Sequence, residues 1–212
     1  MRPFWSERFL WIHLAGLAVV PLSLQVVWLG LAVGAPLPLF WIELLFLAAV
    51  GIVPVFWMQW NRPFDIFSLL IVALKPEQMN PGQGRILSLF KTNKQRFLTA
   101  IAAVFMLWVL WQIYRLAPVA AMAASFLPQW RIAGLLLAAL AFGASNLFIQ
   151  VPVSVLGVLL TSEKQFAATE PCAPEKITQE FTIPGFRVEK IWQGLVTEAT
   201  PEMESTELSA DQ

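Results

Sequence analysis

Residues 132–160 read IAGLLLAALAFGASNLFIQVPVSVLGVLL and carry no charged side chain. At about 1.5 Å of rise per residue, a helix over this stretch is longer than the roughly 30 Å hydrocarbon core of a bilayer. Three further apolar runs, at 9–33, 37–60 and 97–116, are also long enough to cross it. The sequence therefore predicts an all-α membrane protein, with a four-transmembrane-helix bundle over residues 1–160.

Composition agrees with a membrane protein and hides a charge asymmetry. The chain is 58% hydrophobic, its mean hydropathy is +0.65 and its formal net charge is zero. Residues 1–160 carry ten bases and four acids, whereas residues 161–212 carry four bases and ten acids. We therefore expect a basic membrane body and an acidic, mostly disordered tail, with disorder at 161–173 and 197–212. The one cysteine, Cys172, excludes an internal disulfide.

The distribution of Lys and Arg predicts the orientation of the spans. Six bases lie between the second and third spans, two lie at the N-terminus and four lie in the tail. The connection between the third and fourth spans holds only Arg115 and Arg131, and that between the first two spans holds none. By the positive-inside rule, both termini are expected in the cytoplasm.

Two segments between the second and third spans are predicted to lie as helices in the cytoplasmic interface, at about 64–74 and 85–96. The first is apolar but too short to cross the membrane, and the second has an apolar face surrounded by basic side chains. These bases either set topology and anchor the chain, or form a docking surface for anionic lipid or an acidic partner. They are Arg85, Lys91, Lys94 and Arg96.

Glu43 is the one acid inside a predicted span. An isolated charge at membrane depth is costly, so a partner is expected. Arg115, at a comparable depth in the third span, is expected to pair with Glu43, and Gln112 is expected to complete the hydrogen bonds. The pair is either a clamp between helices or, with Asn146 and Gln150, part of an ion or proton site in a small transporter or channel component.

His13 is the only histidine of the chain. It is either a hydrogen-bonded residue near the interface or an axial ligand of a pigment. One histidine without companion ligands cannot build a zinc or di-iron site, so no metal site is predicted. The sequence predicts no bound cofactor and leaves open only chlorophyll or carotenoid.

Small residues recur along the fourth span at a spacing typical of close helix packing. Gly134 with Ala138, and Ala139 with Gly143, form small-x-x-x-small pairs that let two helix backbones approach each other. The contact is expected either within the bundle or with a second molecule.

A cluster of apolar residues interrupts the acidic tail at 174–194. Such a cluster in a solvated segment is typical of a recognition element, which adds a strand to a partner's sheet or folds as a helix in a groove. The alternative is that it folds back on the chain's own interfacial segment. The candidate partner-binding residues are Phe181, Ile183, Phe186, Val188, Ile191 and Trp192.

Four segments carry a resemblance to a known family. They are FLWIHLAG at 9–16, WNRPFDIFSL at 60–69, LKPEQ at 74–78 and RILSLFK at 85–91. They resemble the cyanobacterial family called low-complexity tail membrane protein. The resemblance implies a cyanobacterial thylakoid or plasma membrane; the family name describes an architecture and supplies no catalytic residues.

The function expected from these features is that of a non-enzymatic membrane accessory or assembly factor. The residues do not identify the larger complex. The resemblance implies photosystem biogenesis as its setting. No phosphate-binding glycine loop, paired cysteines or Ser-His-acid set occurs, so an enzyme is not predicted. The expected partners are the lipid bilayer and other membrane-complex subunits. Nucleic acid is not expected, because the basic charge lies at the membrane surface.

Overall fold

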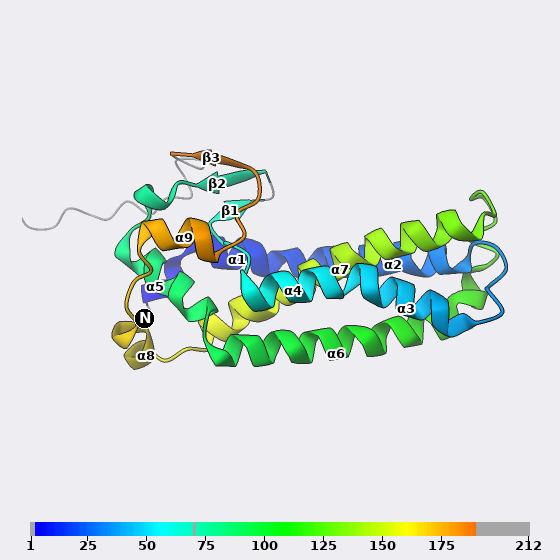
Figure 1. Cartoon of the computed structure of the whole chain (residues 1–212), viewed down its shortest axis with the longest axis horizontal. Coiled ribbons are helices and arrows are strands. Elements are labelled where there is room, and N and C mark those ends of the chain that lie inside the picture. The colour runs from blue at the N-terminus through cyan, green and yellow to red at the C-terminus, as the bar shows by residue number, and fades with distance from the viewer. Residues whose placement is uncertain (1–2, 70, 190–212) are drawn as a thin grey trace, which may run out of the picture.

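The computed structural model describes residues 3–69 and 71–189. In this part of the chain, four helices long and apolar enough to cross a membrane lie side by side in an elongated bundle (Figure 1). They run over Arg8–Ala32, Phe40–Asn61, Asn93–Ala120 and Arg131–Leu159. The predicted four-span bundle is therefore confirmed, with each span boundary within a few residues of its expected place.

Prolines interrupt the first two spans. Pro21 lacks the N–H that would bond the carbonyl of Leu17, and the helix tightens into a 3-10 stretch there; Pro54 follows the break between the two parts of the second span. The first span comprises α1 (Arg8–Ala15), η2 (Gly16–Ala18) and α2 (Val19–Ala32). The second comprises α3 (Phe40–Gly51) and α4 (Val53–Asn61). The third is α6 (Asn93–Leu116) with η4 (Ala117–Ala120), and the fourth is α7 (Arg131–Leu159).

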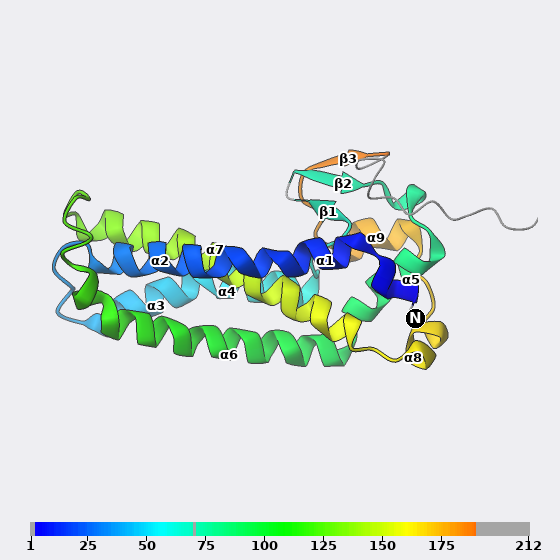
Figure 2. The ribbon, with the colours of Figure 1, turned by 180° about the vertical axis from the view of Figure 1, so that it is seen from behind.

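Helix α7 is the centre of the bundle and crosses it obliquely (Figure 2). In the most apolar 18-residue stretch of α7, 44% of the residues are buried, against 22% in the corresponding stretch of each other span. The small residues bring its N-terminal half against α2: a Cβ on Gly134 would lie 2.5 Å from the carbonyl oxygen of Gly30. Ala138 and Ala139 are buried beside this contact. The Gly134–Ala138 pair thus packs within the bundle.

Replacing Gly134 with alanine is expected to destabilise the bundle by about 1–3 kcal/mol, because the added methyl group must push α2 and α7 apart. Gly143 is the matched control, since its nearest neighbour would lie 3.8 Å from an added Cβ, an ordinary contact. Thermal unfolding of Gly134→Ala and Gly143→Ala in mild detergent measures the difference. Equal midpoints for the two variants would contradict the close approach.

A second unit, here called the cap, lies at the end of the bundle that holds the N-terminus (Figures 1 and 2). Helices α5 and α8 lie beyond the ends of the membrane-spanning helices, whereas a small sheet lies to the side of α1. The cap consists of η1 (Pro3–Ser6), β1 (Ser68–Leu69), β2 (Val72–Leu74), η3 (Pro76–Gln78), α5 (Pro81–Phe90), α8 (Glu163–Ala168), α9 (Pro174–Glu180) and β3 (Phe186–Val188).

The prediction of an interfacial helix at 64–74 is wrong. This segment forms β1 and β2, which pair antiparallel, and β3 from the tail joins parallel to β2. A turn at Asp65 redirects the chain, since its carboxylate accepts a hydrogen bond from the Phe67 N–H at 3.0 Å. The partner strand comes from more than a hundred residues away, so local pattern could not reveal it.

The helix predicted at 85–96 is correct in kind but not in extent or environment. Helix α5 begins after Asn80, whose side chain accepts from the Gln83 N–H in a capping box, and it ends at Phe90. The third span then begins as a separate helix at Asn93. The apolar face of α5 is buried in the cap rather than laid on a membrane surface.

Most of the described tail is also ordered, contrary to the prediction for 161–173. Helix α8 begins after Ser162, whose hydroxyl accepts from the Gln165 N–H, and the Cys172 N–H donates to the carbonyl of Gly84. The predicted disorder at 197–212 lies outside the described residues.

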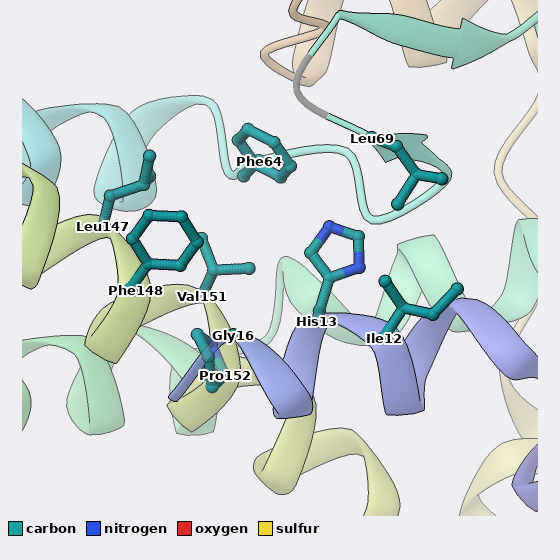
Figure 3. Close-up of a pocket in the computed structure, with 9 residues that line it drawn as sticks. All are labelled: Ile12, His13, Gly16, Phe64, Leu69, Leu147, Phe148, Val151 and Pro152. Carbon is teal, nitrogen blue, oxygen red and sulfur yellow. The ribbon is translucent and has the colours of Figure 1, made fainter. Parts of the chain in front are cut away.

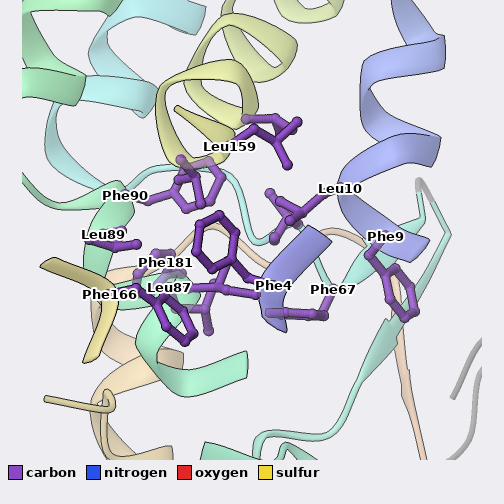
Figure 4. Close-up of a cluster of buried hydrophobic side chains, with 14 of the residues drawn as sticks. Phe4, Phe9, Leu10, Phe67, Leu87, Leu89, Phe90, Leu159, Phe166 and Phe181 are labelled. Carbon is purple, nitrogen blue, oxygen red and sulfur yellow. The ribbon is translucent and has the colours of Figure 1, made fainter. Parts of the chain in front are cut away.

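Residues from six separate parts of the chain build the core of the cap (Figure 4). The rings of Phe4 and Phe166 pack at a tilt of 38° with centroids 4.7 Å apart, and Phe181 is fully buried beside them. The end of α7 closes the core from the bundle side. The buried members are Phe4, Phe9, Leu10, Ile66, Phe67, Leu74, Ile86, Leu87, Leu89, Phe90, Val155, Val158, Leu159, Phe166, Ile177 and Phe181.

Candidate functional site

The most polar site within the spans is built around Glu43, in the first turn of α3. Its side chain is fully buried. One carboxylate oxygen accepts from the Leu37 N–H at 2.8 Å and from Arg131 Nε at 2.7 Å. The other accepts from the Tyr114 hydroxyl at 2.9 Å and from Arg131 Nη2. Both oxygens of Glu43 are therefore occupied twice.

Arg131 extends this site to the remaining span. Its Nη1 donates to the carbonyl oxygens of Leu31 at 2.7 Å and Val33 at 3.0 Å, where the first span ends. The ion pair and its hydrogen bonds thus join the far ends of all four spans, at α2, α3, α6 and α7. We call Glu43, Arg131 and Tyr114 the clamp.

The predicted partners of Glu43 are wrong, although its expected role as a helix clamp fits this geometry. Arg115 is exposed, and Arg131 takes its place. Gln112 is half-buried and makes no hydrogen bond with Glu43 in the described structure. Consecutive helix residues point about 100° apart, so the inward direction of Tyr114 sends Arg115 outward. The overlooked signal in the sequence was the hydroxyl of Tyr114, which directly precedes Arg115.

The other buried polar residues of α7 form no common site with Glu43. Asn146 follows Arg131 by fifteen residues, which is about 22 Å along the helix. Asn146 and Gln150 are fully buried. The Asn146 oxygen and both amide atoms of Gln150 lack a hydrogen-bond partner within residues 3–69 and 71–189.

His13 lies at a largely apolar cavity of about 180 Å³ between α1, α7 and the loop before β1 (Figure 3). Its Nδ1 lies 2.9 Å from the carbonyl oxygen of Phe9, its ring meets Phe64 edge-on at 5.8 Å, and the backbone of Ser68 also interacts with it. Because a carbonyl only accepts, Nδ1 is the donor in its contact with Phe9. Whether the ring also ligates a pigment stays a prediction.

Two acids are buried in the cap. Asp65 is fully buried, and burial raises its pKa to about 6, although the Phe67 N–H partly opposes the shift. Burial likewise raises the pKa of Glu7, which accepts a 3.4 Å hydrogen bond from Gln83. Ionisation of either acid therefore weakens the cap as the pH rises through its folded-state pKa.

The predicted membrane-surface bases largely contact the chain itself. Lys91 pairs with Glu180 of α9 at 2.7 Å, and Lys94 Nζ donates to the carbonyl of Gly157 at 3.3 Å. Arg96 lies over the ring of Trp60, 5.8 Å from its centroid, and the Nε of Arg85 is buried. The first contact lies within the cap, and those of Lys94 and Arg96 join spans to each other. A role in docking lipid stays a prediction.

The candidate partner-binding residues divide into three groups. Phe181 belongs to the cap core, which corrects its assignment to a partner, and Ile183 and Val188 pack partly buried against that core. Phe186 is 77% exposed. Ile191 and Trp192 lie outside the described residues. The element at 174–189 therefore adds its strand to the chain's own sheet, which was the alternative reading of the sequence.

Comparison with known proteins gives one finding. A family model described as "Low-complexity tail membrane protein-like" matches residues 6–193. No curated protein and no solved structure matches the chain.

Proposed function

Because the chain belongs to the low-complexity tail membrane protein-like family, whose name states an architecture and no activity, we propose a function from the geometry. The protein is a non-enzymatic accessory or assembly factor for a larger membrane complex. The cyanobacterial resemblance supports a thylakoid or plasma membrane and a part in photosystem biogenesis. The basic residues at the cap end support a cytoplasmic cap, with both termini on that side.

The clamp is the observation that carries this proposal. Glu43 is the one acid within the four spans, and Arg131, Tyr114 and the Leu37 N–H occupy its carboxylate. A carboxylate held in this way joins helices and has little capacity left for a transported ion. At the other end, the Trp5 indole donates to the carbonyl of Leu159 at 3.2 Å and ties the cap to α7. The proposed factor is therefore a cap that is fixed to a bundle of joined membrane-spanning helices.

Under this proposal, the contacts of the cap restrict where a partner would bind. Residues 174–189 are used by the cap, so capture of a partner is assigned to the segment beyond Glu189 and to the outer faces of the spans. The segment at 190–212 combines the apolar Ile191 and Trp192 with acidic residues. Those acids are Glu198, Glu202, Glu204, Glu207 and Asp211.

A mild-detergent pull-down tests the proposal. The full chain is compared with a chain ending at Glu189, which keeps every described contact, and bound proteins are identified by mass spectrometry. We expect the full chain to recover membrane-complex subunits and the shortened chain to lose at least one. Recovery of no subunit by the full chain would overturn the proposal.

The absorption spectrum of wild type and His13→Ala in the same preparation tests pigment ligation.

A small transporter remains the second candidate because the Asn146 amide oxygen and both amide atoms of Gln150 lack a hydrogen-bond partner among the described residues. Such a protein would lose transport in reconstituted vesicles on Gln150→Leu and keep it when residues 190–212 are removed. An accessory factor is expected to respond the other way, losing partners on truncation.

A further inference from the structure

Two large apolar side chains are exposed at neighbouring backbone positions of the cap's sheet. Ile71 directly precedes β2 and Phe186 opens β3, and the Phe186 N–H donates to the Ile71 carbonyl at 2.7 Å. Their exposed fractions are 67% and 77%. We call this pair the tip. Large apolar side chains that are exposed at the same end of a small sheet indicate contact with lipid or with a partner.

The backbone beside the tip depends on a glycine. Gly185 has a positive φ of 81°, and a Cβ at this position would overlap the backbone of Ile71. Only glycine lets β3 approach Ile71 closely enough for the hydrogen bond. The local backbone therefore holds Ile71 and Phe186 together.

The tip lies at the depth of the spans rather than above them. Figures 1 and 2 show the three strands alongside α1, whereas α5 and α8 lie beyond the helix ends. Leu69, two residues before Ile71, lines the same cavity as Gly16 (Figure 3). Gly16 follows Arg8, the start of α1, by eight residues, or about 12 Å along the helix axis.

Exposed aromatic residues lie near the cap-side ends of the neighbouring helices. Trp11 is 48% exposed on α1, Trp57 is 69% exposed on α4 and Phe97 is 66% exposed on α6. Exposed Trp side chains at the ends of spans are typical of the lipid headgroup region. Leu69 pairs with Val72 across the reversal between β1 and β2, so Ile71 lies at the end of the sheet that is nearest the cavity.

The charges near the tip suit a membrane surface. Arg187 is exposed and adjacent to Phe186, whereas Lys75 and Glu189 neutralise each other at 2.9 Å toward the other end of the two strands. A basic side chain beside apolar ones favours anionic lipid headgroups.

We propose that the tip inserts into the lipid leaflet next to the cap. Ile71 and Phe186 contact acyl chains just below the headgroups, and Arg187 lies among the lipid phosphates. The sheet is then a lateral membrane anchor that fixes the cap against the bilayer, and the surface that covers the tip is lipid rather than a soluble partner.

Depth-dependent quenching tests this inference on the full chain. Single thiols are placed by Ile71→Cys or Phe186→Cys in a Cys172→Ser background and labelled with an environment-sensitive fluorophore. The protein is reconstituted in phosphatidylcholine and phosphatidylglycerol vesicles whose acyl chains carry bromine. Trp57→Cys, on the exposed face of α4, is the lipid-facing control, and Glu77→Cys, exposed beyond the other end of β2, is the water-facing control.

Labels at Ile71 and Phe186 are expected to lose as much fluorescence to the brominated lipids as the label at Trp57, and to resist aqueous iodide. The unlabelled thiols should react slowly with a charged, membrane-impermeant maleimide, whereas that at Glu77 reacts fast. Quenching by iodide with a fast maleimide reaction at both tip positions overturns the inference. If the tip thiols resist the maleimide in native membranes but react fast in the vesicles, a protein rather than lipid covers the tip, which overturns the inference as well.

Discussion

Replacing Arg131 with alanine is expected to destabilise the bundle by about 3–5 kcal/mol. The substitution leaves the fully buried carboxyl group of Glu43 without its counter-charge, and removing one partner of a buried ion pair is strongly destabilising. It also removes the two hydrogen bonds to the carbonyls of Leu31 and Val33. Thermal unfolding in mild detergent measures the loss.

Two comparisons separate the charge from the loss of a side chain. Arg115→Ala removes an equally long base from an exposed position of the adjacent span, and it is expected to change stability by no more than about 0.5 kcal/mol. Arg131→Gln combined with Glu43→Gln removes both charges and should cost less than Arg131→Ala alone. If Arg115→Ala were as damaging as Arg131→Ala, the assignment of the ion pair would be refuted.

The spans could be predicted from sequence because their determinants are local. A helix satisfies its own backbone hydrogen bonds, and a run of apolar residues long enough to cross the bilayer is visible without knowledge of any neighbour. The apolar stretch at 132–160 therefore predicted α7 almost to the residue. The need of Glu43 for a partner followed from the cost of an isolated charge in lipid, which is also independent of the fold.

The identity of that partner could not be predicted, because it depends on how the helices are rotated about their axes. Arg115 lies in the last turn of the third span and Arg131 begins the fourth, so depth alone does not distinguish them. The sheet failed for a related reason. Strand β2 owes its conformation to β3, and Val72 pairs with Phe186, which is 114 residues later in the chain. Local apolar pattern at 64–74 fitted an interfacial helix as well as it fitted a strand.

The tail shows how burial overrides composition. An acidic, polar segment of this kind is expected to remain unfolded unless it contributes enough apolar surface to a core. Ile177 and Phe181 supply that surface: both are essentially inaccessible to solvent, and Arg62 donates to the carbonyls of Thr178 and Phe181 at 3.1 Å each. The described tail is therefore part of the cap.

Phe181→Ala is accordingly expected to destabilise the cap by about 3–5 kcal/mol, through lost apolar burial and the cavity left in the core. The loss is expected to be confined to the cap, since the spans are held together by separate contacts in α7 and by the clamp. Limited proteolysis and amide hydrogen exchange in mild detergent, read separately for α5, α9 and the spans, detect such a local unfolding.

Phe186→Ala is the matched control, because it removes the same side chain from an exposed position in the same segment. In detergent it should leave protection of α5 and α9 within about 0.5 kcal/mol of wild type. A recognition element held ready for a partner would behave differently: Phe181→Ala would then leave the isolated protein intact and lose only the partner. Unchanged protection of the cap in Phe181→Ala would therefore return this residue to partner binding and remove the tail from the fold.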